Sequence, residues 1–230
     1  MLSFIFCTSF ISNQNYNLSS ARWKRWIQFY DERKQFFGAE RIFLIDDASP
    51  VENIPPDIHV IDAGCPLPDR VPDGPVMFRF NQHYGRYSMT IFPGWWGSFT
   101  FSSQIAKQYS FSKIIHCESD AFIISGNLTS YVKQIEAGWV SFWCPRFNFP
   151  ESALQVICRD SFANLEMFYL YGNQFWFQGV IPERIFPFTI IEKNFTGDRY
   201  GEYMDDYPNN ADYVCQSTEN MTFDHQLKIS

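Results

Sequence analysis

The chain has 230 residues, of which 46% are hydrophobic and 19% aromatic, and its formal net charge is −7 at pH 7. This length and composition are typical of a globular domain with one sizeable core. The negative charge and the lack of a long Lys/Arg cluster argue against a protein that binds a nucleic-acid backbone. A nucleotide ligand remains compatible with this charge, because a bound divalent cation can neutralise a diphosphate.

The first sixty residues alternate between short apolar runs and a helical pattern. Residues 2–8 form an apolar run bounded by polar residues, which predicts a buried parallel strand. A helical pattern covers 18–37, with Ser19 or Ser20 as its cap and Gly38 as its end. Two further apolar runs predict strands, and this alternation is typical of a doubly wound α/β sheet. The two runs are 41–45 and 58–61.

The alternation continues through the rest of the chain. Residues 62–80 are rich in Gly and Pro and are predicted to be a loop. The later elements are expected to be helices at 97–111, 127–137 and 161–171 and strands at 113–117, 140–144 and 154–158. We therefore expect one α/β domain over residues 1–230, with a mostly parallel central sheet flanked by helices.

The apolar N-terminal run and the cysteines indicate the cellular compartment in which the protein is expected. Residues 1–12 lack a positively charged start and a convincing cleavage site, so they are predicted to begin a strand and not a signal peptide. No apolar run approaches membrane-spanning length. The six cysteines are scattered, without a C-x-x-C pair, and are expected to be reduced core residues. A cytoplasmic location is the expectation that follows.

Two acidic clusters follow predicted buried strands. Asp46 and Asp47 come after one strand, and Glu118 and Asp120 come after another. Ligands of open α/β sheets bind outside the carboxyl ends of the strands, so both clusters are expected to reach one cleft. Carboxylate oxygens are the ligands that Mg²⁺ and Mn²⁺ prefer. For Asp46 and Asp47 the alternative is a pair that caps the next turn.

These strand ends resemble the nucleotide-binding half of the GT-A glycosyltransferases, over roughly residues 2–125. The first strand ends in a small polar residue, a second ends in Asp-Asp-Ala-Ser, and a later one ends in acid-x-acid, the place of the family's DxD motif. The resemblance implies a GT-A-type, Rossmann-like domain. It also implies that 1–125 binds the nucleotide sugar and metal and that 126–230 binds the acceptor.

The resemblance carries roles for individual residues. Thr8 and Asp46 would contact the base or ribose, and Asp47 would lie close to the nucleotide, as would Ser119. Asp120 would bind the metal with help from Glu118, which stands where the family usually has Asp. His225 is a further candidate metal ligand, with a solvated tail residue as the alternative. His83 or Arg86 would neutralise the departing diphosphate, with a solvated loop as the alternative.

An inverting transferase needs a carboxylate that takes the proton of the acceptor hydroxyl. Glu183 is the first candidate and Asp198 the second. Pro182 precedes Glu183 at an expected helix start, so a plain partner of the helix dipole is the alternative for Glu183. Asp198 lies in a Gly-containing loop, where an exposed acid is often only solvated.

The expected function is therefore a glycosyltransferase, of hexosyltransferase type, that depends on Mn²⁺ or Mg²⁺. It would move a sugar from a nucleoside diphosphate sugar, with a UDP-sugar as the expected donor, to a hydroxyl of a glycan or glycoconjugate, with inversion. A nucleotidyltransferase acting on sugar phosphates is the alternative enzyme, but residues 8–13 contain neither Gly nor Lys to cradle phosphates. A non-catalytic carbohydrate-binding module would explain the aromatics and would have mostly antiparallel strands.

Overall fold

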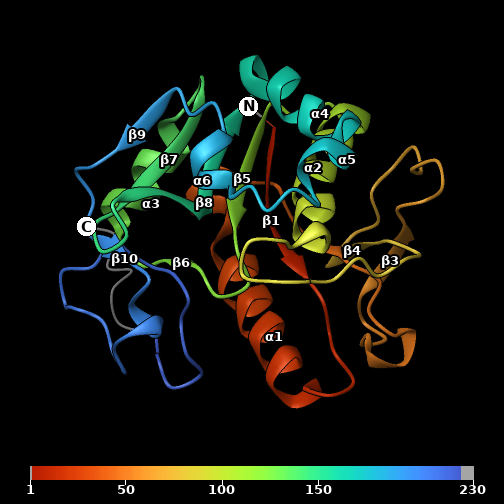
Figure 1. Ribbon diagram of the computed structural model, residues 1–230, viewed down its shortest axis with the longest axis horizontal. Helices are drawn as coiled ribbons and strands as arrows, with labels where there is room; N and C mark the ends of the chain where they lie inside the picture. The colour runs from red at the N-terminus through yellow and green to blue at the C-terminus, as the bar shows by residue number, and fades with distance from the viewer. Residues whose placement is uncertain (1, 224–230) are drawn as a thin grey trace.

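The computed structural model describes residues 2–223, which fold around one eight-stranded sheet (Figure 1). The strand order is β3-β4-β2-β1-β5-β8-β7-β9. Neighbouring strands are parallel except where β8 pairs with β5 and with β7. The strands are β1 (Ser3–Ser9), β2 (Arg41–Asp46), β3 (His59–Asp62), β4 (Val76–Arg79), β5 (Lys113–Cys117), β7 (Trp139–Cys144), β8 (Phe149–Cys158) and β9 (Ile190–Glu192).

Helices cover both faces of this sheet. One core contains side chains of α1 and α3, and the other contains side chains of α2 and α4. The prediction of an α/β fold with a mostly parallel central sheet between helices is therefore confirmed. The helices are α1 (Tyr16–Arg33), α2 (Pro93–Gln108), α3 (Gly126–Gln134) and α4 (Phe162–Leu170).

The central strand β1 shows why the sequence has apolar runs without alternation. Ile5 and Cys7 point into the core under α1, and Phe4 and Phe6 point into the core under α2. All four side chains are fully buried. A strand that is covered on both faces needs apolar residues at every position, which is the pattern of residues 2–8.

Smaller elements complete the fold. Strands from distant parts of the chain form a second, three-stranded sheet in the order β10-β11-β6. The short elements are η1 (Lys34–Phe37), η2 (Val51–Asn53), β6 (Phe122–Ile123), η3 (Arg159–Ser161), α5 (Gly172–Phe175), α6 (Pro182–Ile185), β10 (Gly197–Asp198), η4 (Tyr200–Glu202) and β11 (Tyr213–Val214). Within residues 2–223, no helix is both long and apolar enough to cross a membrane.

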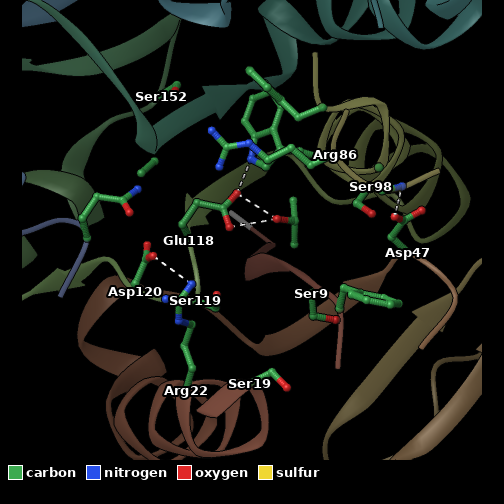
Figure 2. A pocket seen from close by; sticks show the side chains of 18 of the residues that line it. Ser9, Ser19, Arg22, Asp47, Arg86, Ser98, Glu118, Ser119, Asp120 and Ser152 are labelled. Carbon is green, nitrogen blue, oxygen red and sulfur yellow. Dashed lines mark hydrogen bonds and ion pairs between the residues drawn. The ribbon is translucent and has the colours of Figure 1, made fainter. Parts of the chain in front are cut away.

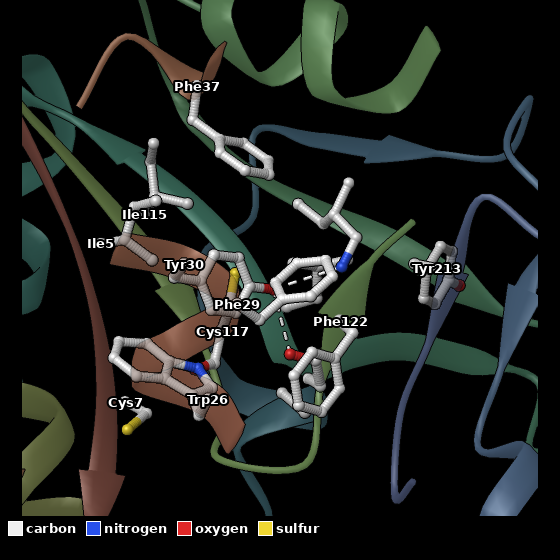
Figure 3. Close-up of a cluster of buried hydrophobic side chains, with 14 of the residues drawn as sticks. Ile5, Cys7, Trp26, Phe29, Tyr30, Phe37, Ile115, Cys117, Phe122 and Tyr213 are labelled. Atoms are coloured by element: carbon white, nitrogen blue, oxygen red, sulfur yellow. Dashed lines mark hydrogen bonds between the residues drawn. The ribbon is translucent and has the colours of Figure 1, made fainter. Parts of the chain in front are cut away.

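Helix α1 anchors the segment that joins β5 to β6 (Figure 3). Trp26 Nε1 donates a hydrogen bond to the carbonyl oxygen of Cys117 at 2.9 Å. The Tyr30 hydroxyl donates to the carbonyl oxygen of Ala121 at 3.0 Å. Both aromatic side chains are fully buried. These two bonds fix the chain on either side of residues 118–120, the second acidic cluster.

Two local predictions were wrong. Strand β4 lies in the segment predicted as a loop, because its apolar run is only a few residues long and is flanked by Gly and Pro. Helix α1 begins at Tyr16, so Ser19 and Ser20 are not caps; the Ser19 hydroxyl donates to the carbonyl oxygen of Asn15. The predicted end is confirmed, since Gly38 follows η1 in the left-handed conformation with φ 71°.

The expectation that the cysteines are core residues is confirmed for five of them and is wrong for Cys65. All six are free, and five of them are buried, whereas Cys65 is exposed. Burial raises the pKa of the Cys7 thiol well above its usual range. Such buried thiols behave as small apolar core residues.

Candidate active site

A cavity of about 790 Å³ opens at the carboxyl ends of β1, β2 and β5. Its lining brings together Thr8 after β1, Asp47 after β2, and Glu118 and Asp120 after β5. Residues of the second half, Glu183 among them, close the opposite side. This is the edge of an open α/β sheet at which ligands bind, and the volume is that of a small-molecule site.

Glu118, which is labelled in Figure 2, is held in one orientation by three donors from three elements. The Thr8 hydroxyl lies 2.8 Å from Oε2 and 3.0 Å from Oε1. Trp95 Nε1 donates to Oε1, and His116 Nε2 lies 2.8 Å from the same oxygen. Glu118 therefore enters the cavity as a fixed acceptor whose oxygens are already largely used.

His116 supports Glu118 from inside the core. Its ring is fully buried and lies between Phe6 and Phe99, with both centroids 4.8 Å away. Nδ1 finds no hydrogen-bond partner among residues 2–223. Nε2 is therefore the ring nitrogen whose N–H donates a hydrogen bond to Glu118, since an N–H on Nδ1 would be buried without an acceptor.

Asp120 has a different environment from that of Glu118. Only 5% of the residue is exposed, and Arg22 Nη1 lies 3.1 Å from Oδ2 (Figure 2). Burial raises the pKa of Asp120 to about 6, the charges of Glu118 and Glu151 add to the rise, and Arg22 opposes it. A buried carboxylate with two negative neighbours and one ion pair is stabilised by any further cation.

Asp46 serves the turn after β2 and does not line the cavity. It is fully buried, and it accepts hydrogen bonds from the Ser9 hydroxyl at 2.9 Å and the Ser49 backbone N–H at 2.7 Å. Burial raises its pKa, while the serine donors oppose that rise. This geometry supports the turn-capping alternative for Asp46 and gives no support to a contact with base or ribose.

Asp47 does line the cavity, and backbone amides fix its carboxylate. Tyr84 N and Gly85 N donate at 3.0 and 2.7 Å, and His83 Nδ1 lies 2.8 Å from Oδ2. Helix α2 approaches so closely that a Cβ on Gly94 would overlap the Asp47 carboxylate. Burial raises the pKa of Asp47, and the two amides oppose the rise.

His83, Arg86 and Ser119 also line the cavity. The His83 ring stacks on Phe10, with centroids 3.9 Å apart. The exposed Arg86 guanidinium donates from Nε to the carbonyl oxygen of Ser88 at 2.9 Å, which leaves it at the rim. All three predicted residues are thus within reach of a ligand in this cavity.

An ion-pair network that the sequence did not suggest forms the opposite wall. Arg199 donates from Nε and Nη2 to Glu151 at 2.7 and 2.9 Å and from Nη2 to Glu183 at 2.9 Å. The Ser152 hydroxyl donates to Glu183 at 2.6 Å. Glu151 is fully buried. Glu183, the first candidate for the catalytic base, therefore faces the cavity with its carboxylate held by two donors.

Asp198, the second candidate, points away from the cavity. Its carboxylate accepts hydrogen bonds from the Cys144 thiol at 3.1 Å and from Arg146 N and Arg199 N at 3.1 and 2.8 Å. The residue is 6% exposed and is not part of the lining. Asp198 is therefore neither a solvated loop acid nor placed for proton transfer, because it fixes the turn between β7 and β8.

Two of the three predicted metal ligands lie together. Glu118 and Asp120 share the turn after β5, whereas His225 lies outside the described residues. No group of three or more His, Cys, Asp or Glu side chains that could hold a metal occurs in residues 2–223. Mg²⁺ is commonly held by one or two carboxylates together with substrate phosphates and water. The two carboxylates and their excess negative charge fit a cation that arrives with a diphosphate.

Comparisons with known proteins find similarity to solved structures. No protein-family model matches the chain, and no curated protein matches its sequence. A solved structure described as the crystal structure of a glycosyltransferase involved in the glycosylation of the major capsid of PBCV-1 is similar over 96% of each chain, with 14% identity and a TM-score of 0.49. Both values are too low to assign a function, which therefore depends on the residues of the cavity.

Proposed function

We propose that this chain is a glycosyltransferase that binds a nucleoside diphosphate sugar in the cavity and transfers the sugar to a hydroxyl of a glycan or glycoconjugate. One observation carries the proposal. Glu118 and Asp120 at the end of β5 share a single cavity with Asp47 on one side and Glu183 on the other. A group transfer from a diphosphate needs a cation site and a proton acceptor that reach the same substrate.

The first wall of the cavity would take the nucleotide. The carboxylate of Asp47 is fixed by two amides and can accept a hydrogen bond from a ribose hydroxyl without reorganisation. Ser119 and Thr8 add hydroxyl groups on the same side. A UDP-sugar is the proposed donor, and the rim residues His83 and Arg86 would meet its diphosphate.

A divalent cation, Mn²⁺ or Mg²⁺, would be held by Asp120 with Glu118 beside it and would neutralise charge on the departing nucleoside diphosphate. Glu118 is suited to a supporting part, because Thr8, Trp95 and His116 already donate to it. Asp120, which has Arg22 as its ion-pair partner, is suited to the direct contact.

Glu183 would accept the proton of the acceptor hydroxyl. Its carboxylate lines the cavity, and its hydrogen bonds with Ser152 and Arg199 hold it on the wall opposite the acid turn. A hydroxyl between Glu183 and the donor sugar would lose its proton to Glu183 as its oxygen attacks the anomeric carbon. A single displacement of this kind inverts the configuration of the sugar.

The two alternatives have less support from the described residues. A carbohydrate-binding module was expected to have mostly antiparallel strands, whereas most strand pairs of the large sheet are parallel. A nucleotidyltransferase would need a Gly-rich, basic loop after β1, and residues 10–15 contain neither Gly nor Lys.

Calorimetric titration of UDP and GDP, with and without Mn²⁺, tests the proposal. In the presence of Mn²⁺ we expect micromolar binding of one nucleotide that is much weaker without the metal and is lost in Asp120→Ala. Asp73→Ala is the matched control, because the Asp73 side chain is fully exposed and outside the cavity. If neither nucleotide binds to the wild-type protein in the presence of Mn²⁺, the glycosyltransferase proposal is wrong.

A further inference from the structure

One face of α1 is directed at the turn that carries Glu118 and Asp120. Arg22, Trp26 and Tyr30 are spaced four residues apart, so they lie above one another on that face. Trp26 and Tyr30 are fully buried and bind the backbone on either side of the turn. The backbone of Arg22 is therefore held one helical turn beyond two fixed anchors.

The guanidinium of Arg22, in contrast, is loosely held. Its side chain is 42% exposed, and its one ion pair within residues 2–223 is the 3.1 Å contact with Asp120. It stands between the cavity and a neighbouring hollow of about 590 Å³. A guanidinium has five N–H donors in a planar fork, so most of its hydrogen-bonding capacity is open to a ligand in the cavity (Figure 2).

The guanidinium of Arg22 occupies the place beside Asp120 that a bound divalent cation would need. Asp120 Oδ2 is the oxygen that Arg22 contacts. A divalent cation on the same carboxylate would repel the guanidinium at this distance, because like charges a few ångströms apart in a partly buried site interact strongly. The long arginine side chain can move aside while α1 stays fixed by Trp26 and Tyr30.

We propose that Arg22 is an exchangeable counter-ion: it pairs with Asp120 in the free protein, is shared between Asp120 and the diphosphate of a bound nucleotide, and passes to the diphosphate completely when Asp120 takes a cation. This rests on the proposed function. The guanidinium fork matches the geometry of phosphate oxygens, so the released side chain gains a charge-assisted partner. Arg22 would thereby favour a nucleoside diphosphate over a monophosphate, since the second phosphate brings the additional charge that it binds.

The proposal predicts effects of opposite sign on two ligands. Arg22→Met keeps the length of the side chain and removes its charge. We expect Mn²⁺ alone to bind about threefold more tightly, because its competitor for Asp120 is gone. We expect UDP without metal to bind about tenfold more weakly, the size of one lost charge-assisted hydrogen bond. Arg22→Lys should lie between Arg22→Met and the wild type for UDP.

The experiment titrates Mn²⁺ alone, and UDP and UMP in the presence of a chelator, by calorimetry. Lys24→Met is the matched control, since Lys24 is an exposed cation two residues further along the same helix and outside the cavity. This control should leave all three affinities unchanged. In the wild type UDP should bind more tightly than UMP, and Arg22→Met should remove most of that difference.

The outcomes separate this proposal from the function on which it rests. If UDP binds with Mn²⁺ but Arg22→Met weakens Mn²⁺ and UDP together, Arg22 only supports the turn and the counter-ion proposal is wrong. Equal metal-free affinities for UDP in wild type and Arg22→Met, or no metal-free binding at all, would overturn it as well. In each of these cases the metal-dependent binding of UDP still supports the transferase.

Discussion

Two arginines that line the cavity pair with buried acids, and they are held very differently. The Arg199 side chain is 17% exposed and donates to Glu151 and Glu183 at 2.7–2.9 Å. It also lies over the ring of Phe149, 5.0 Å from the centroid. The Arg22 side chain is 42% exposed, and its one ion pair with another residue of 2–223 is the 3.1 Å pair with Asp120.

The difference separates a residue that builds the cavity from one that is available to a ligand. Burial lowers the pKa of Arg199, but the hydrogen bonds and charges of Glu151 and Glu183 outweigh it and raise that pKa. At the other end, burial raises the pKa of Asp120 to about 6 although Arg22 opposes the rise. Thus the acids around Arg199 more than offset the cost of burying its charge. Arg22 alone does not offset the cost of burying the charge of Asp120.

The largest expected effect comes from breaking the Arg199 network. Arg199→Met leaves the fully buried Glu151 without its ion-pair partner and should lower the free energy of unfolding by about 3–5 kcal/mol. Arg22→Met removes a guanidinium that is 42% exposed and screened by water, so it should lower the free energy of unfolding by less, about 1 kcal/mol. Urea denaturation of both variants measures the comparison.

Arg199→Met combined with Glu151→Gln is the control for this prediction. The double variant should recover part of the lost stability, because the charge that was left without a partner is also removed. If Arg199→Met and Arg22→Met lowered the free energy of unfolding equally, the two arginines would contribute equally to stability and the contrast between them would be wrong.

The next effect concerns the shortage of positive charge at Asp120. Its pKa in the folded protein, about 6, is above its value of about 3.9 in an unfolded chain, so the folded state binds the proton more tightly. The contribution of Asp120 to the free energy of unfolding is therefore largest below pH 4, and this contribution is lost as the pH rises through 6. The amide of Asp120→Asn does not titrate, so this variant avoids the cost of a buried carboxylate and should be more stable than wild type at pH 7.

The expected gain for Asp120→Asn is at most about 3 kcal/mol at pH 7 and close to zero at pH 4, at about 1.4 kcal/mol per unit of pKa difference. Urea denaturation of both proteins between pH 4 and pH 8 gives the two curves. Asp73→Asn is the control and should follow the wild type, since its side chain is fully exposed. A gain that does not vary with pH would mean that the Asp120 carboxyl is not destabilised by burial.

The strand ends that carry the site were predictable from the sequence, for a simple physical reason. Strands buried on both faces are continuous apolar runs, so the first polar residue after each run marks a strand end. This rule predicted Asp46, Asp47, Glu118 and Asp120 at one edge of the sheet, and all but Asp46 line the cavity. Thr8, which only the family resemblance had pointed to, lines it as well. The same reasoning could not decide which of Asp46 and Asp47 faces a ligand, because the choice depends on the loop that packs against them.

The opposite wall was not predictable, because it depends on contacts between distant residues. Glu151 and Arg199 are 48 residues apart, and neither has a local pattern that marks it as buried or paired. Asp198 was the second candidate for the catalytic base, yet it accepts a hydrogen bond from Arg146 N and fixes a turn. No sequence motif marks Arg22, and only its pairing with Asp120 shows its place in the cavity.

The smallest expected effect tests the other acid of the turn. Thr8→Val keeps the shape of the side chain and removes the hydroxyl that donates to both oxygens of Glu118. Trp95 and His116 still donate to Glu118, so the carboxylate keeps partners. The free energy of unfolding should fall by about 1 kcal/mol, and Thr8→Ser should retain most of it. A loss as large as that of Arg199→Met would mean that Glu118 depends on one donor. Glu118 would then be no more firmly held than Asp120, which has Arg22 as its ion-pair partner.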